Sequence, residues 1–295
     1  LQRIALQGPL EVKPHGLNLL RLGSWRMGLV REDNDVEWVG ETRAMPIANQ
    51  LKETSASIVP IITPSFGQPP QLAFPLLEVR YQASFEMDYK GQVSLLMEPQ
   101  SLTGDWRILV NEGLVITEGN FEPIDAHVRE SVGVDITEAL KPGRNDILVE
   151  LTADRSDQGL RNPLYLAGEF GVWLDPVRIA SRPTYGTFDG WEANGLPFYA
   201  GVVDYHGTFH YKSSKPPSDE VSLLIDFGLP FDDACEVSVN GGSWTPLLWS
   251  PRTALFDAKG LKPGINRISV RVYTTLIRSF EGQRFDITSH AYQDL

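Results

Sequence analysis

One strand-and-turn pattern occurs twice along the chain, and this repeat limits the fold more than any other feature of the sequence. The stretch VRYQASFEMDYKGQVSLL, from Val79 to Leu96, resembles VDYHGTFHYKSSKPPSDEVSLL, from Val203 to Leu224. In both stretches an aromatic-x-x-x-Phe segment precedes an identical Val-Ser-Leu-Leu segment. Such repetition predicts tandem copies of one structural module.

The two copies also continue in the same way. Each reaches a Val-Asn pair, at Asn111 in the first copy and at Asn240 in the second, and later a Leu-Lys-Pro-Gly-x-Asn motif that ends at Asn145 and at Asn266. Proline fixes φ and glycine accepts positive φ, so a Pro-Gly pair forms a tight turn at which strands reverse direction. An apolar strand is expected after each of these turns.

Short apolar segments fill the chain between its 21 prolines and 26 glycines. Segments such as WRILVNEG, NDILVELT, CEVSVNGG and NRISVRVYTT alternate or run apolar for four to eight residues, and they are rich in Val, Ile, Leu and Thr. This pattern is typical of strands, and long amphipathic helical windows are missing. The sequence therefore predicts an all-β fold with the architecture of a sandwich or a barrel.

Two segments before the first copy are harder to place. The stretch from Lys13 to Leu22 is a weak third echo of the repeat, which fits either the last strand of a preceding module or, as we predict, the opening strand of the first one. The proline-rich stretch from Val59 to Pro75 is too apolar for a free linker. We expect it to lie extended against the first sandwich.

Composition excludes some partners. The chain has 295 residues and a formal net charge of -12, which argues against a nucleic-acid partner because phosphate contacts need a basic surface. No run approaches the roughly 18 apolar residues of a membrane span. The start, LQRIALQG, is not a signal peptide and lacks an initiator Met, so we expect a piece of a longer chain whose localisation stays open, with secretion or a periplasmic location as options.

Signatures of catalysis are missing from the sequence. It has no HExxH, GxSxG, phosphate-loop, CxxC or Rossmann pattern, and Cys235, the single cysteine, is expected to be an ordinary strand residue. Glu98, Glu169 and Asp226 lie at predicted strand ends, but nothing selects a catalytic pair among them. We predict no cofactor. A structural calcium ion stays compatible with the loop carboxylates, although no EF-hand spacing occurs.

Two histidines in one predicted strand do not indicate a metal site. His206 and His210 fall on the same polar face, and roughly 13 Å separates residues four apart in a strand. One zinc ion needs ligand bonds of about 2.0–2.1 Å and cannot take both. We interpret them as solvated strand residues, opposite an apolar face that includes Val203 and Phe209.

Aromatic residues in loops are the candidates for carbohydrate contact, because pyranose C–H faces pack well on exposed rings. Trp244 and Trp249 lie in the loop GGSWTPLLWSPR, and Arg252 adds hydrogen-bond donors in a fixed fork. Burial of the two tryptophans against a neighbouring domain is the alternative. Trp191, in DGWEANGLPFYAG, fits either a sugar-stacking platform or an aromatic plug at one end of a sandwich. Trp106 begins a predicted strand and is expected in the core.

These motifs resemble a known family. GLPFYAGVVDYHGTF, EVSVNG, W-x-P and GLKPGINRISVRVYTTL in the second copy, and WRILVNE, VDITEALKPGRNDILVEL and LYLAGEFGV in the first, resemble the sugar-binding jelly-roll domain of family 2-type glycoside hydrolases. Their order resembles the C-terminal part of bacterial α-L-rhamnosidase-like hydrolases. The resemblance implies two tandem antiparallel β-sandwich domains of galactose-binding-like type, at residues 1–178 and 179–295. It places the catalytic carboxylates in an upstream domain.

Three functional hypotheses follow. The first, which we favour, is a non-catalytic accessory segment of a larger glycoside hydrolase, with structural and carbohydrate-binding roles. It implies a carbohydrate and the upstream catalytic domain of the same chain as partners. The second is a free-standing carbohydrate-binding module. The third is a complete small glycoside hydrolase.

Overall fold

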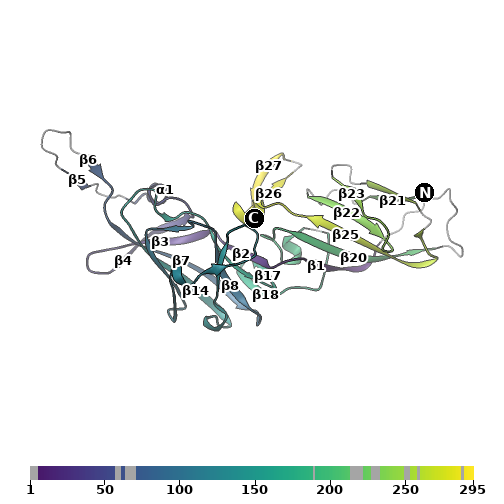
Figure 1. Cartoon of the computed structure of the whole chain (residues 1–295), viewed down its shortest axis with the longest axis horizontal. Coiled ribbons are helices and arrows are strands. Elements are labelled where there is room, and N and C mark those ends of the chain that lie inside the picture. The colour runs from purple at the N-terminus through teal and green to yellow at the C-terminus, as the bar shows by residue number, and fades with distance from the viewer. Residues whose placement is uncertain are drawn as a thin grey trace. The chain divides into compact units, whose positions relative to one another are not determined.

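The computed structural model describes residues 6–56, 61–63, 71–188, 190–212, 222–226, 233–248, 253–257, 260–286 and 289–295. These residues fold almost entirely into β-strands, which confirms the predicted all-β class. They form two compact units, which we call unit A (Leu19–Gly168 and Leu174–Ala180) and unit B (Leu1–Asn18, Glu169–Trp173 and Ser181–Leu295). Figure 1 shows these strands as arrows, coloured by their position along the chain.

Unit A is a sandwich whose larger sheet is built around two long antiparallel strands, β7 (Leu77–Asp88) and β14 (Gly143–Ala153), which lie side by side in Figure 1. Four further strands continue this sheet in antiparallel pairs: β10 (Asp105–Val110), β11 (Leu114–Ile116), β3 (Ser24–Val30) and β4 (Val36–Arg43). β18 (Val177–Ser181) pairs with β7 in parallel, a departure from the expected antiparallel pairing. Alternate residues of β7 are buried, as expected for a strand with one face on a core.

The second sheet of unit A supplies the other half of its core. Its strands, in spatial order, are β12 (Glu122–Pro123), β13 (Val132–Asp135), β8 (Val93–Met97), β16 (Leu164–Gly168) and β2 (Asn18–Leu22). A short pair, β9 (Leu102–Thr103) with β15 (Gly159–Leu160), and the helix α1 (Ile47–Glu53) add to the unit, together with the 3-10 turns η1 (Glu118–Asn120) and η2 (Thr137–Ala139). The largest fully buried side chains of the unit include Trp25, Met27, Tyr81, Leu95, Tyr165 and Leu96.

Unit B is built around the equivalent pair of long strands. β20 (Val202–Tyr211) and β25 (Gly264–Tyr273) lie at the centre of a sheet with the order β19 (Tyr185–Gly186), β1 (Leu6–Pro14), β20, β25, β22 (Ala234–Val239), β23 (Thr245–Leu247). Further elements are the strand pairs β21 (Ser222–Asp226) with β24 (Thr253–Asp257) and β26 (Gln283–Asp286) with β27 (Ala291–Asp294), the turn η3 (Glu192–Asn194), and the helix α2 (Ile277–Phe280). β17 (Phe170–Leu174) belongs largely to this unit.

The predicted boundaries at residues 178 and 179 differ from the observed units at the N-terminus. β1 pairs with β20 from Leu6 to Pro14, so the first strand of the chain completes the sheet of unit B. Within the weak third echo, only β2 joins unit A, where it pairs with β16. Sequence order alone does not reveal that a strand from far upstream lies between β19 and β20 in the sheet of unit B.

The proline-rich segment has strand structure in its described part, in keeping with an extended conformation. Its described residues form two short strands, β5 (Ile61–Thr63) and β6 (Gln71–Ala73), which pair with each other in antiparallel orientation. Residues 59, 60 and 64–70 of this segment lie outside the described residues. Among the helices of the described residues, none is long and apolar enough to cross a membrane.

Two paired asparagines hold the repeated turn together in each unit, and we call this arrangement the asparagine clamp. In unit A, Asn111 Nδ2 donates to Asn145 Oδ1 (2.7 Å), and Asn145 Nδ2 donates to the carbonyls of Lys141 (2.7 Å) and Gly143 (2.9 Å). Lys141 N–H donates to Asn145 Oδ1 (2.9 Å). Asn145 is fully buried, so these bonds satisfy backbone groups that solvent does not reach.

Unit B repeats the clamp atom by atom. Asn240 Nδ2 donates to Asn266 Oδ1 (2.8 Å), and Asn266 Nδ2 donates to the carbonyls of Lys262 (2.8 Å) and Gly264 (3.1 Å). Lys262 N–H donates to Asn266 Oδ1 (2.8 Å). The first asparagine of both clamps has φ of 50°, a left-handed conformation that asparagine tolerates better than most residues. The two units are therefore copies of one module in detail as well as in pattern.

Candidate functional site

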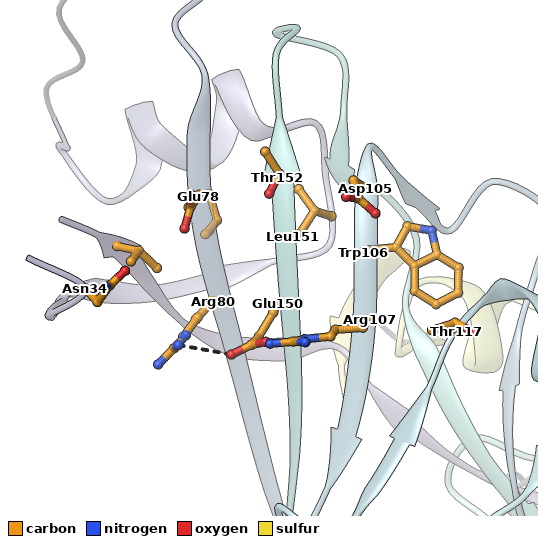
Figure 2. Close-up of a pocket in the computed structure, with 12 residues that line it drawn as sticks. Asn34, Glu78, Arg80, Asp105, Trp106, Arg107, Thr117, Glu150, Leu151 and Thr152 are labelled. Carbon is orange, nitrogen blue, oxygen red and sulfur yellow. Dashed lines mark hydrogen bonds and ion pairs between the residues drawn. The ribbon is translucent and has the colours of Figure 1, made fainter. Parts of the chain in front are cut away.

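A shallow groove of about 520 Å³ lies on the larger sheet of unit A, across β7, β14 and β10 (Figure 2). Asn34, in the turn between β3 and β4, borders one side, and Thr117, directly after β11, borders the other. Its volume is within the range of about 300–1,000 Å³ that is typical of small-molecule sites. The groove was not predicted from the sequence, because its residues come from strands far apart along the chain.

Two cross-strand rows of polar side chains form the floor of the groove. Strand register places Glu78 opposite Thr152, and Thr152 opposite Asp105. Successive side chains in a strand point to opposite faces, so the next row on the same face lies two residues further along each strand. That row, which we call the charged row of unit A, consists of Arg80, Glu150 and Arg107, and Figure 2 shows its three side chains lying across the sheet.

Ion pairs hold the charged row in place. Arg80 Nη2 lies 3.0 Å from Glu150 Oε1, and Arg107 Nε donates to the other oxygen of the same carboxylate. Arg107 is 59% exposed, so this pairing contributes little to stability, about 0–1 kcal/mol. Its effect is geometric: the guanidiniums of Arg80 and Arg107 keep fixed positions. With Glu78 and Asp105 included, three carboxylates face two guanidiniums, and the groove carries a formal charge of about -1.

Trp106 lines the same groove, which corrects the prediction that it lies in the core. Its side chain is partly exposed, and its ring contacts Phe121 edge-on, with the ring centroids 6.2 Å apart. Figure 2 shows the indole beside Thr117. Trp106 has the register of the buried residues Ile108 and Val110. It lies at the start of β10, however, where the sandwich no longer covers it fully.

The equivalent face of unit B carries a charged row of opposite sign. Glu150 lies five residues after Asn145, and Arg271 lies five residues after Asn266. In the register of β20, β25 and β22, Arg271 is opposite both Asp204 and Glu236. Arg271 Nε donates to Asp204 Oδ1 (2.7 Å), and its Nη1 donates to Glu236 Oε1 (3.3 Å). The row Arg–Glu–Arg of unit A is therefore replaced by Asp–Arg–Glu.

Trp244, a predicted sugar-binding residue, covers this second row. The Cζ atom of Arg271 lies 4.5 Å from the centroid of the Trp244 ring, in the geometry of a cation–π contact. Trp244 follows Asn240 by four residues, and the residue that follows Asn111 by four is Val115, which is 50% exposed. A long aromatic side chain thus covers the row in unit B, whereas a short valine leaves the row of unit A open.

Asp204 connects this row to the N-terminal strand. His15 Nε2 lies 2.9 Å from Asp204 Oδ2, and Arg271 bonds both carboxylate oxygens. Burial alone would raise the pKa of Asp204. The hydrogen bonds from Arg271 and His15 outweigh that effect and hold the pKa below its ordinary value.

A pH prediction follows from the lowered pKa of Asp204. Its ionised form stabilises unit B above the ordinary carboxyl pKa of about 4, and that contribution is lost as pH falls through the lower pKa of the folded state. We expect the thermal midpoint of the native chain to fall more steeply below pH 4 than that of an Asp204→Asn variant. Calorimetric scans from pH 7 to pH 2.5 measure this, and parallel curves for the two proteins would contradict it.

Of the other predicted carbohydrate contacts, the structure describes only Trp191. Trp249 and Arg252 lie outside the described residues. Trp191 is 2% exposed, and its Nε1–H donates to Asp233 Oδ2 (2.8 Å). A ring buried to this extent offers no face to a sugar, so the platform interpretation of Trp191 is wrong, and the residue packs in the core of unit B.

The carboxylates considered for catalysis are divided between the two units. Glu98 is in unit A, where it accepts a hydrogen bond from Tyr165 (2.9 Å) and lies 3.7 Å from His127 Nε2. Glu169 is exposed and, like Asp226, belongs to unit B. Glu98 has a structural role here. Its carboxylate accepts a hydrogen bond at the edge of a buried aromatic contact between Tyr165 and His127.

The histidines of β20 lie as predicted. Val203 and Phe209 are buried on one face of the strand, whereas His206 is partly exposed and His210 is exposed. His206 Nδ1 is 2.9 Å from Ser269 Oγ. Within the described ranges, no group of three or more His, Cys, Asp or Glu residues is placed to hold a metal ion. A calcium site stays a prediction.

Comparison with known proteins gives structural likenesses only. No family model matches the chain, and no curated protein does. The solved structures that it resembles include a β-D-mannosidase from Dictyoglomus thermophilum, with 12% identity and a TM-score of 0.35. A GH2 β-galacturonidase from Eisenbergiella tayi bound to galacturonate (12%, 0.30) and a Bifidobacterium dentium β-glucuronidase complexed with coumarin-3-O-glucuronide (12%, 0.34) are similar to the same extent.

The coverage of these structures is uneven. They match 87%, 90% and 88% of this chain, but only 31%, 38% and 43% of their own chains. The chain thus spans less than half the length of each enzyme. The rhamnosidase-like part of the resemblance seen in the sequence stays a prediction.

Proposed function

We propose that this chain is a non-catalytic accessory segment of a larger glycoside hydrolase, in which two sandwich modules support a catalytic domain and one of them contacts carbohydrate. The observation that carries the proposal is the duplicated asparagine clamp, which makes units A and B copies of one module. A duplicated module seldom places a unique acid–base pair in either copy, and its copies are free to diverge at the surface. The motifs that resemble sugar-binding jelly-roll domains support the same interpretation.

The surfaces of the two copies support a division of roles. The charged row of unit B is bonded within the chain and covered by Trp244, so this face contributes to the module's own structure. The row of unit A is open and lines a groove of ligand size. A binding role for the second module through Trp244 and Trp249, as predicted from the sequence, is retained here only as the second candidate. The partial exposure of Trp244 favours it.

The natural coding sequence around this segment tests the proposal. We expect one reading frame that also encodes a region large enough for a catalytic barrel, about 250 residues or more. Deletion of the two modules from that longer protein should lower its thermal midpoint and its glycosidase activity together. A reading frame that encodes the two sandwiches alone would contradict the accessory role and favour a free-standing carbohydrate-binding module.

A further inference from the structure

We infer that the groove of unit A binds a neutral pyranoside, and that Val115 keeps the groove open. The inference rests on the proposed function only for its biological setting, since binding by the isolated chain needs no catalytic domain. It concerns a site on a sheet face of unit A and does not involve the loop tryptophans that the sequence suggested. Its basis is the chemistry of the two rows, their net charge, and the comparison with the covered face of unit B.

The rows present donors and acceptors in alternation. Glu78 and Asp105 present carboxylate acceptors on either side of Thr152, whose hydroxyl is able both to donate and to accept. One step along the same face, Arg80 and Arg107 supply fixed donors on either side of Glu150. A ligand that matches this surface needs several groups that donate and accept at short spacing, which is the property of ring hydroxyls.

The charges of the groove decide between neutral and acidic sugars. Both guanidiniums already contact Glu150, and the exposed carboxylates of Glu78 and Asp105 stand in the adjacent row. A uronate would bring a further negative charge to a groove with a formal charge of about -1. A neutral glycan meets no such repulsion, and its hydroxyls can donate to these carboxylates in charge-assisted hydrogen bonds.

Unit B shows how the same surface is closed. There the Trp244 ring lies over the guanidinium of Arg271, which is opposite Glu236 in the sheet. Val115 has the equivalent place in unit A, opposite Leu109 on the edge strand β11, where its side chain is exposed. A tryptophan at this position is long enough to lie across Arg107 toward Glu150. Val115→Trp therefore closes the groove without removing any residue that lines it.

The test is a titration of the isolated 295-residue chain by saturation-transfer NMR and by a glycan array. The probes are methyl β-D-glucopyranoside, methyl β-D-galactopyranoside, methyl β-D-mannopyranoside and neutral disaccharides, with methyl β-D-glucuronide as the acidic counterpart. We expect dissociation constants of about 1 mM for at least one neutral probe, as suits an open site. Weaker binding or none is expected for the glucuronide.

Val115→Trp should weaken neutral-glycan binding at least tenfold. Ile265→Trp, which adds the same side chain at an exposed site of unit B, should leave binding unchanged. Unchanged thermal midpoints show that both variants fold. The double variant Glu78→Gln/Asp105→Asn should shift preference toward the glucuronide. The inference is overturned if no neutral probe binds, if the glucuronide binds best to the native chain, or if Val115→Trp binds like the native chain. If the binding inference is overturned, the accessory role is still tested independently by the reading frame.

Discussion

Replacing Asn266 by alanine is expected to lower the free energy of unfolding of unit B by about 3–5 kcal/mol, because four hydrogen bonds of its buried side chain disappear together. The loss leaves the Lys262 N–H and two carbonyls without their partner inside the turn. Asn145→Ala should have the same effect on unit A, since Asn145 makes the matching bonds. Urea unfolding monitored by hydrogen exchange separates the two units and measures each effect.

A matched substitution outside the clamps measures the effect of removing an exposed side-chain amide. Asn49 is exposed on α1, and Asn49→Ala should change stability by no more than about 0.5 kcal/mol. If Asn145→Ala and Asn266→Ala both cost less than about 1 kcal/mol, the clamp does not hold the turns, and the account of the duplicated module loses its physical basis. A loss confined to one unit would show that the copies have diverged in how they are stabilised.

Truncation of Trp191 is the second change with a large expected effect. The ring is buried in the core of unit B beside Tyr205, and Trp191→Ala should cost about 3–5 kcal/mol, as core truncations of tryptophan do. The substitution also removes the donor to Asp233, a carboxylate that is itself only 9% exposed. Chemical denaturation of both proteins measures the difference.

Trp191→Phe separates packing from hydrogen bonding in this core. It keeps an aromatic ring but removes the N–H that bonds Asp233, so an intermediate loss of about 1–3 kcal/mol is expected. Glycan-array signals should stay those of the native chain in any fraction of the variant that remains folded. Selective loss of glycan binding without loss of stability would contradict the core assignment and restore the sugar-platform interpretation.

Local patterns were sufficient to predict the all-β fold class and the buried face of individual strands. The alternation in VVDYHGTFHY predicted the buried face of β20 correctly, including Tyr205 and Phe209, because a strand with one face on a core imposes a period of two. The repeated Leu-Lys-Pro-Gly-x-Asn motif predicted equivalent turns, and the structure gives the reason for its terminal asparagine. That residue bonds backbone groups of the turn that no water reaches.

The features that could not be predicted depend on contacts between distant segments. β1 comes from the opposite end of the chain to pair with β20 in the sheet of unit B, and no local pattern encodes which strand it will pair with. The groove of unit A depends on the register of β7, β14 and β10, which sets Glu78, Thr152 and Asp105 in one row. Trp106 was misplaced because its alternation is that of a core residue, whereas its exposure depends on where the sandwich ends.

The charged rows became visible only by comparing the two units in register. Counting from the clamps pairs Glu150 with Arg271 and Arg107 with Glu236, a reversal of charge that sequence alignment of the short repeat did not reveal. In both units the central residue of the row pairs with its two neighbours, but the charges are reversed. A carboxylate lies between two guanidiniums in unit A, and a guanidinium lies between two carboxylates in unit B. The two rows also differ in what lies over them. The position four residues after the first asparagine of the clamp is Trp244 in unit B and Val115 in unit A, and this difference is the physical basis of the proposed division of roles.

Turnover by the isolated chain is the most direct test of the central claim that this segment is non-catalytic. Purified chain at high concentration would be incubated with aryl β-galactosides, β-mannosides, β-glucuronides and α-L-rhamnosides, beside a Glu98→Gln variant and a buffer control. The account predicts release of aryl alcohol no faster than in buffer for every substrate. Release above buffer that disappears in the Glu98→Gln variant, or in matching variants of Glu169 or Asp226, would contradict it.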